Sequence, residues 1–322
     1  MIVVDLSVSM EGVFGLTWQD WKRLIASVED LGFASLYLSD HFLLPAPPDQ
    51  PSVELIVALT YLADHTERVR FGPMVSPLSF RDPVLLARQA AALYDLSDGR
   101  MVLGVGTGWM EREHTVFGYD LGDVPTRFDR LEEGLEVITR LLRSNEPVDF
   151  EGQHFRLRQA TLPGPRGPEA PPIMIGGTGP KRTLPLVARF ADIWNAQAIG
   201  PAELLERSAM LDEMLQKSGR RPEDVRRTLN IPVVCGRTEA EQEARMRGVR
   251  HLSLWQGLPF EDLLQVVRDW PGLVGTPEEI VTQIHAFEAA GMSEISLQWA
   301  AADDIEGLEI LAAEVLPHMT NR

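Results

Sequence analysis

Met101-Val102-Leu103-Gly104-Val105-Gly106-Thr107-Gly108-Trp109 is the stretch that says most about the fold of this chain. A short apolar strand opens there into a loop with three glycines in five residues, and it follows a helix-ending turn at 96–100. Glycine lets a backbone approach a ligand that a Cβ atom would hold away. Barrel enzymes place phosphates and flat cofactors at such strand ends, although a tight turn that needs positive φ explains the glycines equally well.

Short apolar strands alternate with amphipathic helical patterns along the rest of the chain. This alternation predicts an α/β fold, a single (β/α)8 TIM barrel domain over residues 1–322, with a doubly wound open sheet as the alternative. The expected strands are 2–8, 35–38, 69–75, 101–105, 172–175, 193–196, 229–235 and 294–298. The expected helices are 18–31, 53–65, 83–93, 127–142, 181–189, 203–217, 277–289 and 304–316.

Three stretches interrupt this rhythm. Residues 148–157 read as an extra hairpin that turns at 151–153, and the proline- and glycine-rich residues 162–172 read as an irregular loop. Residues 236–275 are long for one connection, so we expect them to form a helical insertion near the barrel mouth.

Charge and composition exclude several classes of function. The formal net charge is -17 over 322 residues, which opposes nucleic-acid binding because that needs cations to neutralise phosphates. The longest apolar runs are too short for a transmembrane helix, and the start of the chain reads as a strand rather than a signal peptide. The only cysteine is Cys235. We therefore expect a cytoplasmic protein without a membrane partner.

The ends of the predicted strands carry the candidate chemistry, because barrel enzymes place functional residues there. Asp40-His41 follows the second strand, where a histidine can exchange a proton near neutral pH; a helix-capping aspartate beside a passive histidine is the alternative. Gly176-Gly177-Thr178-Gly179 precedes a helix whose free N–H groups could hold a phosphate, and Lys181 could add charge. Trp109, Trp194 and Trp299 could wall a flat ligand or belong to the core.

Other catalytic sites have weak support. The seven histidines lack metal-ligand spacing, so no metal is expected. Glu111, Glu113 and His114 do not share one helix face, and we expect them on a solvated surface. The chain has no serine-nucleophile elbow, and Cys235 has no evident base in the sequence.

These motifs together resemble the luciferase-like flavin and deazaflavin oxidoreductases. Each motif is weak alone, but their order and spacing are specific and cover most of the chain. The matching segments are 39–42 (SDHF), 80–83 (FRDP), 96–100 (LSDGR), 104–109 (GVGTGW) with Glu113 and 117–118 (FG), Arg127, Glu133, 171–177 (PPIMIGG), 191–195 (ADIWN) and 275–279 (GTPEE). Residues 181–192 resemble the branch that depends on coenzyme F420.

The resemblance implies a (β/α)8 barrel that binds coenzyme F420, or FMN as the alternative, at the strand ends. It implies hydride transfer at the deazaflavin C5 with His41 as catalytic residue, a small-molecule substrate, and a homodimer. A flavin-dependent monooxygenase or reductase and a non-catalytic flavin-binding barrel stay open. The implied cofactor-binding residues are Asp40, Met74, Val75, Ser76, Gly106, Thr107, Gly108, Gly176, Gly177, Thr178 and Gly179; the implied substrate-pocket residues are Trp109, Trp194 and Trp299.

Two further expectations follow from the resemblance. In deazaflavin relatives a non-proline cis peptide after the third strand supports the cofactor ring, and Met74–Val75 is the matching bond. In relatives that oxidise sugar phosphates a glutamate occupies the position of Trp109, so that activity is not expected of this chain.

Overall fold

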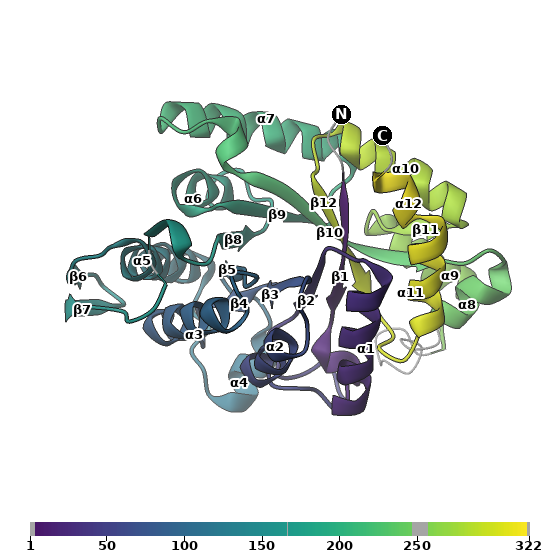
Figure 1. The fold of residues 1–322 in the computed structure, drawn as a ribbon, viewed down its shortest axis with the longest axis horizontal. Helices are drawn as coiled ribbons and strands as arrows, with labels where there is room; N and C mark the ends of the chain where they lie inside the picture. The colour runs from purple at the N-terminus through teal and green to yellow at the C-terminus, as the bar shows by residue number, and fades with distance from the viewer. Residues whose placement is uncertain (1–3, 166, 247–256, 321–322) are drawn as a thin grey trace.

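Parallel strands curve into a barrel in the computed structural model, which describes residues 4–165, 167–246 and 257–320 (Figure 1). The hydrogen-bonded order around the ring is β3-β2-β1-β12-β10-β9-β8-β5. A bridge between Phe71 and Met101 joins the two ends of this order and closes the ring. The barrel strands are β1 (Asp5–Met10), β2 (Ser35–Leu38), β3 (Arg70–Pro73), β5 (Leu103–Gly106), β8 (Ile173–Gly176), β9 (Ile193–Gln197), β10 (Arg226–Cys235) and β12 (Glu294–Trp299).

This order confirms the predicted (β/α)8 barrel and excludes the doubly wound open sheet. The strands are buried on both faces, which is why they read as nearly continuous apolar runs. The predicted start of the first strand at residue 2 lies outside the described residues, and the strand itself runs two residues further than expected, to Met10.

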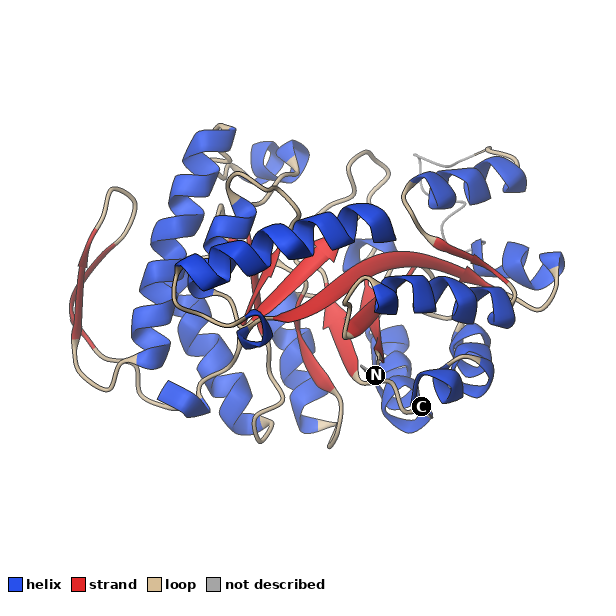
Figure 2. Ribbon diagram, turned by 90° about the horizontal axis from the view of Figure 1, so that it is seen from above, coloured by secondary structure: helices blue, strands red, loops and turns tan. Residues whose placement is uncertain are grey.

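Helices cover the outside of the barrel in Figures 1 and 2. Several begin where a cap residue satisfies free backbone N–H groups: Asp82 accepts from Val84 and Leu85 ahead of α3, and Thr276 and Glu279 form a capping box ahead of α10. The helices are α1 (Trp18–Leu31), α2 (Leu55–Asp64), α3 (Pro83–Leu96), α4 (Glu111–Phe117), α5 (Val124–Arg143), α6 (Thr183–Phe190), α7 (Pro201–Lys217), α10 (Pro277–Ala289), α11 (Ile305–Glu314) and α12 (Leu316–Thr320), with short 3-10 turns at Gly12–Phe14, Gly167–Glu169 and Pro222–Asp224.

The predicted strand at 69–75 is interrupted. β3 ends at Pro73, the Met74–Val75 peptide is cis, and β4 (Ser76–Pro77) then pairs with β5. The cis bond expected from the family resemblance is therefore confirmed, and we call the segment Pro73–Ser76 the bulge.

The hairpin and the insertion lie on opposite sides of the barrel (Figures 1 and 2). β6 (Val148–Glu151) and β7 (Arg156–Ala160) form the predicted hairpin, and Glu133 of α5 accepts hydrogen bonds from three N–H groups in its turn. The insertion contains α8 (Glu239–Met246) and α9 (Phe260–Asp269), which confirms the expected helices, and also β11 (Leu273–Gly275), a short strand that pairs with β10 and was not expected. The middle of the predicted 236–275 insertion lies outside the described residues.

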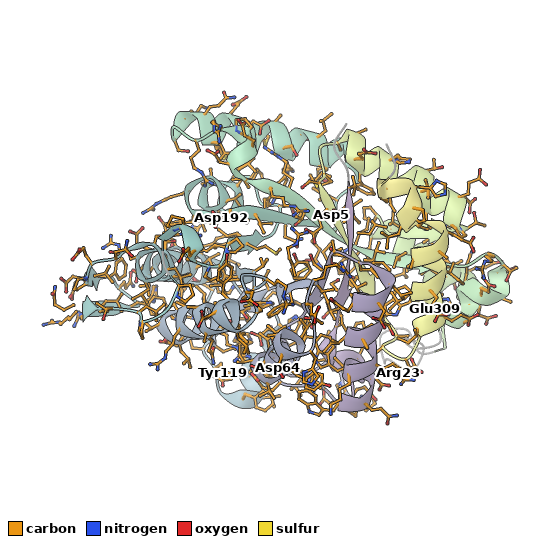
Figure 3. The ribbon with its side chains drawn as sticks, in the orientation of Figure 1. Asp5, Arg23, Asp64, Tyr119, Asp192 and Glu309 are labelled. Atoms are coloured by element: carbon orange, nitrogen blue, oxygen red, sulfur yellow. The ribbon has the colours of Figure 1, made fainter. Side chains whose placement is uncertain are left out.

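A buried ion cluster fills the end of the barrel where the strands begin. Glu294 is 1% exposed, and its Oε2 lies 3.3 Å from Arg70 and 3.2 Å from Arg226. Both arginines also contact Asp5, which Figure 3 labels beside the barrel strands, and Ser7 donates to Glu294. These charges close this end, so a ligand site must lie at the other end.

None of the helices in the described part of the chain has the length and apolar content that crossing a bilayer requires.

Candidate active site

A cavity of about 430 Å³ opens at the C-terminal ends of the strands. It brings together residues that follow strands all around the ring, as expected for a barrel enzyme. The predicted site residues that line it are His41, Met74, Val75, Gly106, Thr107, Gly108, Trp109, Gly176 and Gly177.

The cavity has two walls of different character. Glycines of β5 and β8 and the loops after them form one wall together with Met74 and Val75; we call this the glycine wall. In the ring order, β5 and β8 lie across the barrel from β12 and β1. The remaining side, which we call the apolar wall, is formed by residues after β1, at the end of β10, and on and just after α9: Val13, Phe14, Val234, Leu263, Val266, Val267 and Trp270.

The glycines of this wall make room for the bulge. A Cβ atom at Gly104 would clash with the carbonyl oxygen of Pro73, and one at Gly106 would lie 2.7 Å from Cγ2 of Val75. A Cβ at Gly176 would lie 3.2 Å from Cγ1 of Val75. The glycine-rich pattern in the sequence suggested a loop that approaches a ligand. The structure gives these glycines a second role, because Gly104, Gly106 and Gly176 leave room for Val75.

The loop after β8 has a different geometry. Gly177 has a φ of 120° and its N–H donates to the carbonyl of Asn195 at 2.9 Å, so this N–H is not available to a ligand. In the described part of the chain, the N–H groups of Thr178 and Gly179 have no acceptor. These two residues stand just outside the cavity lining, ahead of the start of α6 at Thr183.

His41 is held by a buried carboxylate. Its Nδ1 lies 3.0 Å from Oε1 of Glu113, and Oε2 of Glu113 accepts from the N–H of Phe42 at 2.9 Å. Glu113 lies on α4 and is 1% exposed. Because an ionised carboxylate only accepts, Nδ1 carries a proton, and Nε2 remains without a partner among the described residues. His41 can therefore offer Nε2 to a ligand in the cavity.

The charges around His41 favour its protonated form. Burial alone would lower the pKa of the imidazole, but the hydrogen bond to Glu113 and the negative charges of Glu11, Glu113 and Asp40 act the other way. The net result is a His41 pKa above its ordinary value.

Asp40 and Ser76, which were expected in the cofactor site, are buried and lie outside the lining of the cavity. The Asp40 carboxylate accepts from Ser76 Oγ at 2.7 Å and from Nε and Nη2 of Arg81 at 2.9 and 2.6 Å. Both side chains are buried, and their polar atoms satisfy one another. They tie β2 to β4 and so fix the backbone on either side of the cavity.

The three predicted tryptophans lie in different surroundings. Trp109 lines the cavity, is 61% exposed and meets the His41 ring edge to face at 5.6 Å. Trp194 is fully buried and its Nε1 donates to the carbonyl of Gly177, and Trp299 is buried against the position of Gly307. Both side chains belong to the barrel core and lie outside the lining of the cavity, so their expected role in the substrate pocket stays a prediction.

Several residues in or beside the site were missed by sequence reasoning. Glu113 and His114 are buried and not solvated as expected: His114 bonds Met110 through Nδ1 and Ser79 through Nε2. Glu11 and Trp270 line the cavity. Glu11 was missed because the first strand was expected to end at residue 8, whereas it ends at Met10 and puts Glu11 at the strand end.

Other kinds of site have no support in the described residues. They contain no group of three or more histidine, cysteine, aspartate or glutamate side chains placed to hold a metal ion. Cys235 is buried, and burial together with the charge of Glu314 raises the pKa of its thiol to about 12, so it stays protonated at neutral pH.

A family profile described as luciferase-like monooxygenase matches residues 4–294. The chain belongs to the luciferase-like monooxygenase family. Among similar members, an F420-dependent glucose-6-phosphate dehydrogenase of Intrasporangium calvum is 30% identical over 315 residues, which cover 90% of this chain and 91% of that protein. An F420-dependent hydroxymycolic acid dehydrogenase of Mycobacterium tuberculosis is 30% identical over 302 residues, covering 91% and 76%.

A solved structure confirms the fold of this luciferase-like chain. An F420-dependent secondary alcohol dehydrogenase in complex with an F420-acetone adduct superimposes with a TM-score of 0.83 at 21% identity, covering 99% of each chain.

Proposed function

We propose that this protein is a coenzyme F420-dependent oxidoreductase that exchanges a hydride with a small organic substrate. The observation that carries the proposal is the pairing of His41, whose Nε2 is open to the cavity, with the bare backbone surface of the glycine wall. The family membership and the names of the two 30% identical relatives agree with it.

The residues on the glycine wall fit a flat cofactor ring. Gly106, Gly108, Gly176 and Gly177 present backbone without side chains, so a ring can approach more closely than a Cβ would permit. Met74 and Val75 of the bulge would support the ring from the same side. The N–H groups of Thr178 and Gly179, next to the start of α6, suit a phosphate group of the cofactor.

When bound, coenzyme F420 supplies hydride exchange at its C5 carbon. The protein supplies position and a proton. Nε2 of His41 can donate a proton to an oxygen of the substrate in reduction, or accept one in dehydrogenation. Glu113 keeps the ring oriented, and Asp40 with Arg81 holds the backbone from which His41 projects.

We also propose that the enzyme works in the cytoplasm as a homodimer. A single cysteine permits no intramolecular disulfide, which supports a reducing compartment. Exposed apolar side chains on α2 and α3, among them Val57 and Leu85, support a protein interface.

Cofactor choice can be tested by binding. Titration of the protein with coenzyme F420 and with FMN, followed by the absorbance of the bound cofactor, should give the tighter dissociation constant for F420. Gly176→Ala should weaken F420 binding by about tenfold, roughly 1.4 kcal/mol, because the added methyl group enters the glycine wall.

Gly200→Ala is the matched control, since a Cβ there meets nothing within 4 Å and lies outside the cavity. Tighter binding of FMN would instead favour the flavin-dependent monooxygenase or reductase. Equal F420 affinity of Gly176→Ala and the parent would contradict the placement of the ring on the glycine wall.

A further inference from the structure

We infer that the substrate is an uncharged, largely apolar molecule with one hydroxyl or carbonyl oxygen, and that anionic substrates are rejected. This inference rests on the proposed function, because it assigns the glycine wall to the cofactor and leaves the apolar wall for the substrate. The apolar wall starts in the loop after β1, across the barrel from β8, and continues over the end of β10 and α9, and His41 follows β2.

The apolar wall is built as a separate hydrophobic unit. Val13, Leu44, Val234, Met246, Leu263 and Leu264 form a cluster that is distinct from the barrel core. Val266 and Trp270 continue it along α9 and are still partly exposed. Half-exposed apolar side chains that border a cavity gain free energy when an apolar ligand covers them.

The charge on this side of the cavity is negative. Glu11 lines the cavity after β1, and Gln298 of β12 donates to its Oε1 at 2.8 Å. The carboxylate is close enough to raise the pKa of His41. A phosphate or carboxylate on the substrate would face this like charge, which disfavours its binding.

Among the described residues, no lysine or arginine side chain lines the cavity, and the cationic form of His41 is already paired with the carboxylate of Glu113. Sites for phosphate or carboxylate groups normally supply such cations in hydrogen-bonding geometry. The described part of the apolar wall therefore lacks the lysine and arginine side chains that normally bind a phosphate group, such as that of glucose 6-phosphate, the substrate named for one relative.

The proposed reaction needs one hydride, which the cofactor would supply, and one proton, which His41 would supply. In the reducing direction, the substrate carbonyl carbon receives a hydride from the reduced deazaflavin and its oxygen receives a proton from Nε2 of His41. The substrate gains two electrons and becomes an alcohol, and the deazaflavin is oxidised by the same two electrons.

A matched pair of probes tests the inference. 4-Methylcyclohexanone and 4-oxocyclohexanecarboxylate share one ring and one ketone, and they differ in a methyl group against a carboxylate. Calorimetry on the cofactor-loaded enzyme should show at least about tenfold tighter binding of the methyl compound, with a negative heat-capacity change from apolar burial. Turnover with each probe is measured in parallel.

Two variants locate the effect. Val266→Arg puts a cation into the apolar wall, and it should reduce the preference for the methyl compound by about tenfold or more. Leu205→Arg on α7 is the control: Leu205 is also exposed and lies outside the cavity lining, so the preference should not change.

The outcomes separate the substrate class from the proposed function. Equal or tighter binding of the carboxylate, tight binding of glucose 6-phosphate, or absence of binding by either ketone would overturn the inference. Selective binding of the methyl compound without any cofactor turnover would support the apolar site and contradict the oxidoreductase function.

Discussion

At the scale of single residues, the contact between His41 and Glu113 determines what the cavity can do. The carboxylate fixes which ring nitrogen carries a proton and leaves Nε2 toward the cavity. Because its second oxygen accepts from the N–H of Phe42, it also fixes the backbone that carries the ring. Glu113 thus acts as a positioning residue through His41.

The charge of Glu113 should appear in the pH dependence of the reaction. Protonated His41 donates the proton in reduction, so the rate is highest below the raised His41 pKa and is lost as the pH increases through it. Glu113→Gln removes the charge and keeps an amide oxygen that can accept from Nδ1 of His41, although its NH2 group cannot accept from the N–H of Phe42. The decline in kcat/KM should therefore move to lower pH. His41→Ala should lower the rate about 10²–10⁴-fold at every pH.

Glu111→Gln is the control for this experiment, since Glu111 lies on the same helix and is exposed. A pH profile of Glu113→Gln that coincides with the parent profile would show that the carboxylate charge does not set the His41 pKa.

The sequence predicted His41 and could not predict its partner. His41 follows a strand, and strand ends are where barrel enzymes carry function. Glu113 lies 72 residues further along the chain. Glu113 lies among acidic and basic residues on the short helix α4, and a helix exposed to solvent has the same composition. Only the fold places this helix over the end of β2.

At the scale of elements, the bulge and its glycines act as one unit. β5 and β8 can pass close to Pro73 and Val75 only where Gly104, Gly106 and Gly176 lack side chains. Strand positions were predictable from apolar runs, but the interruption at residues 74–75 came from the family resemblance alone. β11 was missed because three residues are too few for a periodic pattern.

Gly104→Ala should destabilise the protein by about 1–3 kcal/mol, the usual range for overpacking a buried site. The new methyl group would overlap the Pro73 carbonyl oxygen and lie 3.1 Å from Cγ1 of Val75, so two backbone segments must separate. Urea unfolding measures the change, and Gly200→Ala at the N-cap of α7, where a Cβ meets nothing within 4 Å, shows what a glycine substitution costs without a clash. Unfolding midpoints that agree for Gly104→Ala and the parent would mean that β3 and β5 can separate without cost.

At the scale of the whole molecule, the alternation of strands and helices was enough to predict a barrel, but not what its outer surface contacts. A helix that packs on the barrel needs an apolar inner face, and the sequence shows that face clearly. Apolar residues on the outer surface of the helices do not recur at a helical spacing that the sequence would reveal. On α2 and α3, Val57 and Leu85 are 55% and 54% exposed.

Size-exclusion chromatography with light scattering at micromolar concentration should give twice the chain mass for the parent. Leu85→Glu should shift it towards the monomer, because a buried unpaired charge opposes association. Leu205→Glu on α7 should leave the mass unchanged, since that helix is outside the proposed interface. A parent that elutes at the chain mass would reject the homodimer.

The ion cluster at the closed end of the barrel has a consequence for synthesis on the ribosome. β1 pairs with β2 on one edge and with β12 on the other, and Glu294 joins Asp5 through their shared arginines. While the chain is being made, β1 emerges early and its second partner emerges almost last. At about 5–20 residues per second, this strand must wait roughly 15–60 seconds with one edge unpaired, and Arg70 must wait roughly 11–45 seconds for its buried acid. Protection of that nascent edge is a task for the cell, because no part of the chain made before β12 can pair with it in the native register.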